Sequence, residues 1–64
     1  MRVGVVGAGK IGRLRITSVR ENPATTLAAV LDVNKAAAES AVAGTGAVAC
    51  SDLAVFLGQK LDVV

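Results

Sequence analysis

The sequence opens with MRVGVVGAGKIG (residues 1–12), and this stretch carries most of the information about architecture. An apolar, β-branched run from Arg2 to Val6 is followed at once by glycines in the pattern G-x-G-x-x-G, and the residues from Lys10 to about Glu21 are compatible with a helix. Short apolar runs with little alternation are typical of strands buried on both faces. We therefore expect a strand, a glycine turn and a helix, which is how a dinucleotide-binding unit begins.

Each residue of the glycine pattern has a physical role in such a unit. Gly7 would allow the tight turn out of the strand, and Gly9 would let a pyrophosphate approach the backbone. Gly12 would let the helix pack closely on the sheet. The free N–H groups at the start of the helix, around Lys10 and Ile11, would point at the phosphates and carry the positive end of the helix dipole. A glycine turn that binds nothing is the alternative interpretation.

An acidic residue, Asp32, completes the pattern. It lies near the end of the next apolar run, Thr25 to Val33, about 20 residues beyond Gly12. A carboxylate there can accept hydrogen bonds from both ribose hydroxyls of NAD, whereas it would repel the 2′-phosphate of NADP. NAD is therefore the favoured cofactor, although Lys35 lies near enough to weaken the distinction. A solvent-exposed acid that caps the next helix is the alternative.

The rest of the chain predicts an α/β fold in the order β-α-β-α-β-α-β, with a parallel sheet of Rossmann type and right-handed crossovers. In the first helix, Ile11, Leu14 and Ser18 share one face. The later elements expected are a helix over Lys35–Ala43 with Gly44 at its C-terminal end, a weak strand over Ala47–Cys50, a helix over Asp52–Leu57 with Ser51 as N-cap, and a fourth strand that begins at Leu61. Because the printed sequence ends at Val64, inside this fourth strand, the sheet is expected to be incomplete.

Composition excludes several functional classes. The chain has 64 residues, 53% of them hydrophobic, with one cysteine and no histidine, so neither an internal disulfide nor an ordinary zinc site is expected. The longest uncharged run, Ala41 to Ser51, is too short to span a membrane. The net charge of +2 and the single aromatic residue do not suggest a nucleic-acid binder. We expect a soluble cytoplasmic protein.

Positive charge is concentrated near the N-terminus. The residues that precede the first acid, Glu21, include Arg2, Lys10, Arg13, Arg15 and Arg20. Either a solvated helix face or a site that attracts an anion would produce this distribution.

Three stretches together resemble the N-terminal part of the Gfo/Idh/MocA oxidoreductase family, typified by glucose–fructose oxidoreductase and inositol dehydrogenase. They are MRVGVVGAGKIG, LAAVLDVNKAAAESAVA and CSDLAVFLGQKLDVV, and they cover nearly the whole chain. The resemblance implies hydride transfer between NAD or NADP and a sugar, inositol or related polyol. It also implies a site in which Gly7, Gly9, Lys10, Ile11 and Gly12 line the pyrophosphate and Asp32, Val33 and Asn34 line the adenosine ribose.

Two departures from the family pattern limit what can be transferred. Arg15 stands where the family often has a histidine, and residues 1–64 end before the threonine-proline turn and the Glu-Lys-Pro motif that carry the family's catalysis. We therefore expect residues 1–64 to be the N-terminal part of a dinucleotide-binding domain, with the second, substrate domain absent and no catalytic residue present. The other acids are most simply interpreted as surface or capping residues, and Cys50 is interpreted as a small buried residue.

Two other functions remain open at this point. The chain could belong to another Rossmann dehydrogenase, of the amino-acid or reductase type, or it could be a non-catalytic nucleotide-binding module. In all three cases only one short helix would cover the second sheet face, so Val3, Val5, Val6 and Leu27–Leu31 would leave much of an apolar face exposed. We expect copies to associate through that face.

Overall fold

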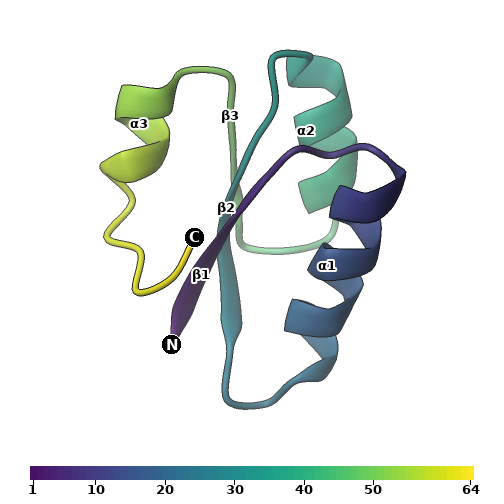
Figure 1. The fold of residues 1–64 in the computed structure, drawn as a ribbon, viewed down its shortest axis with the longest axis vertical. Helices are drawn as coiled ribbons and strands as arrows, with labels where there is room; N and C mark the ends of the chain where they lie inside the picture. Colours follow the sequence, from purple (N-terminus) through teal and green to yellow (C-terminus); the bar gives the residue numbers. More distant parts are fainter.

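Three parallel strands form the centre of the molecule in a computed structural model that describes residues 1–64 (Figure 1). The strands are β1 (Arg2–Val6), β2 (Thr26–Leu31) and β3 (Val48–Cys50), and they lie side by side in the order β1-β2-β3. The helices that follow them are α1 (Lys10–Glu21), α2 (Lys35–Val42) and α3 (Leu53–Leu57). This alternation confirms the expected α/β fold with an incomplete Rossmann-type parallel sheet.

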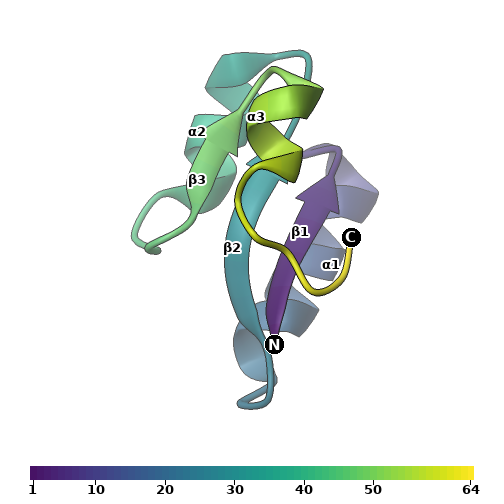
Figure 2. The same cartoon turned by 90° about the vertical axis from the view of Figure 1, so that its left-hand side faces the viewer.

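The helices divide unequally between the two faces of the sheet. Helices α1 and α2 lie together on one face, and the short helix α3 lies on the other (Figures 1 and 2). The first face carries the larger core, which consists of Val3, Val5, Ala8, Ile16, Leu27, Val30 and Ala38. The second face carries a smaller cluster of Ala29, Cys50 and Phe56, with Leu31 and Leu61 packed against it.

Phe56, the only aromatic residue, fills much of the space on the α3 face. Its side chain is fully buried, and a Cβ added at Gly4 of β1 would lie 2.6 Å from its ring. Gly4 therefore lets the ring lie directly on the sheet. As a result, the expected exposure of Val3, Val5 and residues 27–30 is wrong, because the helices on the two faces bury all of them. Val6 does remain exposed, and self-association stays a prediction.

Helix α1 does not pack on the sheet through the face that Ile11, Leu14 and Ser18 share. Its buried residues are Gly12 and Ile16, whereas Ile11 and Leu14 are 68% and 64% exposed. The rotation of the helix is set by the close approach of Gly12 to the turn after β1, and this approach places Ile11 and Leu14 on the solvent side. The spacing of Ile11 and Leu14 therefore does not indicate which face of α1 is buried.

The caps of the two shorter helices are side-chain oxygens. Asn34 Oδ1 accepts a hydrogen bond from Ala37 N at 3.2 Å at the start of α2, and Asp52 Oδ1 accepts from Ala54 N at 2.7 Å at the start of α3. The predicted Ser51 cap is therefore wrong by one residue. A carboxylate at the N-cap accepts a charge-assisted bond and also faces the positive end of the helix dipole.

The expected fourth strand is present only as a single parallel bridge between Val63 and Val3. Gly4 N donates to Val63 O at 2.8 Å, and Asp62 N donates to Arg2 O at 2.7 Å. Residues 62–64 thus lie beside β1 on the side away from β2, so that β1 has a neighbour on each side. None of the helices has the length and apolarity that crossing a membrane requires.

Candidate functional site

Two glycines after β1 are required by the fold itself. Gly7 has φ +92°, a left-handed conformation that favours glycine, and its N–H donates to Leu31 O at 2.7 Å. A Cβ added at Gly12 would overlap the carbonyl oxygen of Gly7. The turn and the first turn of α1 therefore touch backbone to backbone, as expected for both residues.

Gly9, between these two glycines, has a different environment. It is the N-cap of α1 and has φ −73°, a conformation open to any residue, and a Cβ added there would meet no atom within 4 Å. The first backbone bond into the helix is from Arg13 N to Gly9 O at 2.9 Å. No acceptor in the chain receives the N–H groups of Lys10, Ile11 and Gly12, and no side chain caps this end of the helix.

These unpaired amides open onto a surface hollow of about 470 Å³ at the carboxyl end of β1. The residues that line it are Val6, Gly7, Gly9, Lys10, Ile11, Gly12 and Arg15. No carboxylate lines this hollow, while two cationic side chains and the positive end of α1 do. The donor set suits a phosphate or pyrophosphate, which binds well at a helix N-terminus that presents free N–H groups.

Asp32 follows β2 and lies beside the glycine turn. Its Oδ2 accepts a hydrogen bond from Ala8 N at 2.7 Å, and its Oδ1 accepts from Asn34 N at 2.8 Å. These backbone amides, Asn34 first and then Ala8, hold the pKa of the Asp32 carboxyl below its ordinary value, so it is ionised at neutral pH. Each carboxylate oxygen has capacity for a further hydrogen bond, as the recognition of a ribose would require.

The structure brings together most of the predicted site residues. All five residues of the glycine pattern line the hollow, and Asp32 is joined to the same segment through Ala8. Val33 and Asn34 lie outside the hollow. The Val33 side chain is almost wholly exposed, and the Asn34 side chain caps α2.

Two residues that line the hollow were not predicted as site residues. Val6 is the last residue of β1, and Arg15 stands one helical turn beyond Ile11 on α1. Residues three and four apart share a helix face, so the position of Arg15 relative to Ile11 and Gly12 could have identified it. In the sequence it stood out as one of the N-terminal cations and as a departure from the family pattern.

Comparison with known proteins identifies one family. The sequence model of the Gfo/Idh/MocA group, described as an oxidoreductase family with an NAD-binding Rossmann fold, matches residues 1–64. No curated protein and no solved structure matches the chain. The family match agrees with the parallel sheet, the glycine turn and the placement of Asp32 beside it. The chain therefore belongs to the Gfo/Idh/MocA family of oxidoreductases and carries that family's NAD-binding Rossmann fold.

Proposed function

We propose that residues 1–64 form the N-terminal, cofactor-binding part of an oxidoreductase that transfers hydride between a nicotinamide cofactor and a sugar, inositol or related polyol. The observation that carries the proposal is the environment of Gly9. Its missing side chain would meet nothing in the chain, and unpaired helix amides surround the same hollow. The family match supports an oxidoreductase, and the substrate class follows from the family members that the sequence resembles.

In this proposal the glycine segment holds the pyrophosphate. The amides of Lys10, Ile11 and Gly12 donate to its oxygens, and Gly7 and Gly9 keep the approach free of side chains. Asp32 accepts hydrogen bonds from the adenosine ribose hydroxyls, with Val33 and Asn34 beside it. These residues all lie at the carboxyl ends of β1 and β2, where parallel α/β sheets bind their ligands.

We propose NAD rather than NADP as the preferred cofactor. The Asp32 carboxylate is ionised and already accepts two backbone hydrogen bonds. A 2′-phosphate placed beside it would add a like charge at short range, which is unfavourable. The hydrogen bonds to Asp32 come from the backbone amides of Ala8 and Asn34 and not from an arginine side chain that could reverse this effect.

The nicotinamide ring, when bound, supplies or accepts the hydride. The residues of this chain bind and orient the cofactor. Hydride transfer at an alcohol carbon also needs a general acid or base at the reacting oxygen. The chain has no histidine and the hollow is lined by no carboxylate, so we place the acid–base group outside residues 1–64.

A fluorescence titration with NADH and NADPH tests the proposed binding. The chain has no tryptophan or tyrosine, so the reduced nicotinamide dominates the signal. We expect saturable binding of NADH, about ten-fold tighter than that of NADPH. This affinity ratio corresponds to the free energy that one charge-assisted hydrogen bond contributes. In Asp32→Asn the preference should shrink strongly, because the repelling charge is gone.

Glu39→Gln is the matched control, since Glu39 is exposed on α2 and also loses one negative charge. Its preference should equal that of the unchanged protein. Equal binding of NADH and NADPH by the unchanged protein would contradict the choice of NAD, and absence of binding would contradict the cofactor site. Turnover of NAD with polyols but not with amino acids, measured on the full-length protein, tests the substrate class.

A further inference from the structure

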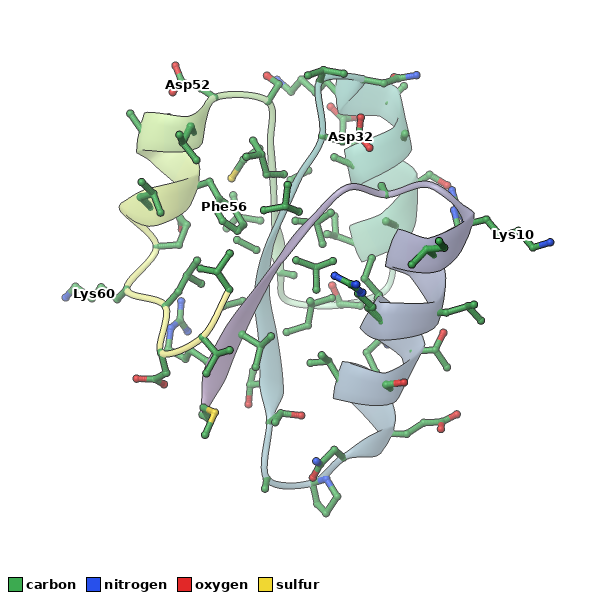
Figure 3. All side chains as sticks on the ribbon, viewed as in Figure 1. Lys10, Asp32, Asp52, Phe56 and Lys60 are labelled. Atoms are coloured by element: carbon green, nitrogen blue, oxygen red, sulfur yellow. The ribbon has the colours of Figure 1, made fainter.

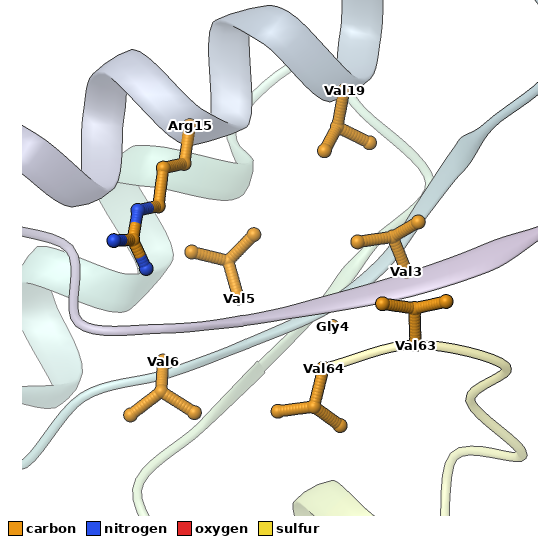
Figure 4. A pocket seen from close by; sticks show the side chains of 8 residues that line it. All are labelled: Val3, Gly4, Val5, Val6, Arg15, Val19, Val63 and Val64. Atoms are coloured by element: carbon orange, nitrogen blue, oxygen red, sulfur yellow. The ribbon is translucent and has the colours of Figure 1, made fainter.

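A second hollow, of about 320 Å³, adjoins the first along the edge of β1. It is mostly apolar, and its lining residues are Val3, Gly4, Val5, Val6, Arg15, Val19, Val63 and Val64 (Figure 4). Only Val6 and Arg15 line both hollows. Arg15 therefore stands at the boundary between a hollow rich in backbone donors and one that is almost entirely aliphatic.

The Arg15 side chain makes no hydrogen bond or ion pair within the chain, whereas those of Arg2 and Arg13 do. Arg13, on the same helix, donates to Ala8 O at 3.3 Å and to Ser40 Oγ at 3.4 Å. Arg2 donates to the carbonyl oxygens of Lys60 and Gln59. The Arg15 side chain extends from α1 toward the carboxyl end of β1, with its guanidinium beside Val5 (Figure 4). All its donors are thus available to a ligand in the adjoining hollows.

The position of Arg15 relative to Asp32 gives the direction of a bound dinucleotide. Asp32 follows β2 on one side of β1, whereas the apolar hollow is bounded by Val63 and Val64 on the other side. Figure 3 shows Asp32 and Lys10 at the same end of the sheet. A dinucleotide with its adenosine ribose at Asp32 and its pyrophosphate on the amides of α1 would extend its other half across β1, past Arg15.

We propose that Arg15 binds the phosphate that lies farther from the adenosine, at the mouth of the apolar hollow. This inference rests on the proposed cofactor site. Arginine suits the role because its planar guanidinium donates two parallel hydrogen bonds to phosphate oxygens. Arg15 is exposed and makes no bond within the chain, so its guanidinium can turn toward a phosphate at this position.

The test compares Arg15→Gln with Arg20→Gln, a control that removes the same charge from an exposed position on the same helix. NADH binding is followed by fluorescence, and AMP and ADP are measured by displacement of NADH. In Arg15→Gln we expect affinity for NADH and ADP to fall about ten-fold or more, because both carry the second phosphate. Affinity for AMP should stay within two-fold (about 0.4 kcal/mol) of that of the unchanged protein. Arg15→Lys should recover part of the loss, since lysine keeps the charge but not the paired donors.

Two results would overturn the inference while leaving the cofactor site intact. One is NADH binding by Arg15→Gln as tight as that by Arg20→Gln. The other is an equal loss of affinity for AMP, ADP and NADH, which would place Arg15 near the adenosine or attribute the loss to the fold. Failure of the unchanged protein to bind NADH would instead contradict the proposed function, and the role of Arg15 with it. The thermal unfolding midpoints of Arg15→Gln and Arg20→Gln should match that of the unchanged protein, because neither arginine side chain makes a hydrogen bond within the chain.

Discussion

Gly9 and Gly12 stand three residues apart, yet the chain accounts for only one of them. At Gly12 a side chain would overlap the Gly7 carbonyl, so packing alone requires glycine there. At Gly9 a side chain would point into open space from an unstrained backbone. The contrast teaches that packing within the chain requires glycine on the inner side of the glycine segment, at Gly12, whereas no contact within the chain requires it on the outer side, at Gly9.

The largest expected effect follows from filling the inner side. Gly12→Ala forces α1 away from the turn after β1, and overpacking of this kind costs about 1–3 kcal/mol, only partly offset by the better helix propensity of alanine, about 1 kcal/mol. We expect a clearly lower midpoint of urea unfolding. Gly46→Ala is the control. A Cβ added at Gly46, unlike one added at Gly12, meets no atom within 4 Å, and the Gly46 backbone is unstrained. Equal stability of the two variants would refute the proposed contact.

Filling the outer side should affect binding rather than folding. Gly9→Ala places a methyl group at the mouth of the hollow, so we expect NADH affinity to fall about ten-fold or more. The free energy of unfolding should change by no more than about 0.5 kcal/mol, as for other exposed positions. A shift in the urea midpoint as large as that of Gly12→Ala would remove the distinction between the two glycines, and unchanged NADH affinity would show that the hollow is not used.

The smallest expected effect on stability concerns Asp32, whose carboxylate accepts hydrogen bonds from the glycine segment and from the start of α2. Hydrogen bonds from Asn34 and Ala8 lower the pKa of its carboxyl in the folded state. Its contribution to stability is therefore fully present above the unfolded value of about 3.9 and is lost as pH falls through the lower folded value. Asp32→Asn should be less stable than the unchanged protein at pH 6, and the difference should narrow by pH 3. A difference in urea midpoint that is constant between these pH values would contradict this linkage, and Glu39→Gln serves as the charge-matched control.

Sequence analysis predicted the order of elements and the roles of Gly7 and Gly12, because glycine spacing and apolar runs report directly on backbone turns. It could not give the packing face of α1, because the apolar residues Ile11 and Leu14, which share one face, are both exposed. That face is selected by a contact between two backbones, which leaves no trace in the hydrophobic pattern. The spacing of Arg15 from Ile11 could have placed it at the first hollow, but its contact with the second could not be predicted, since the second hollow depends on residues 62–64 lying beside β1.

The hydrogen bonds of Asp32 also constrain how cofactor preference can change. The same carboxylate that would discriminate against a 2′-phosphate fastens the glycine turn to the start of α2, through Ala8 on one side and Asn34 on the other. A redesign toward NADP that replaces Asp32 with a small or basic residue would remove both hydrogen bonds and so loosen the turn. A successful change of cofactor preference therefore needs a second substitution that again holds the glycine turn to the start of α2. Related proteins that changed their cofactor should carry both substitutions together.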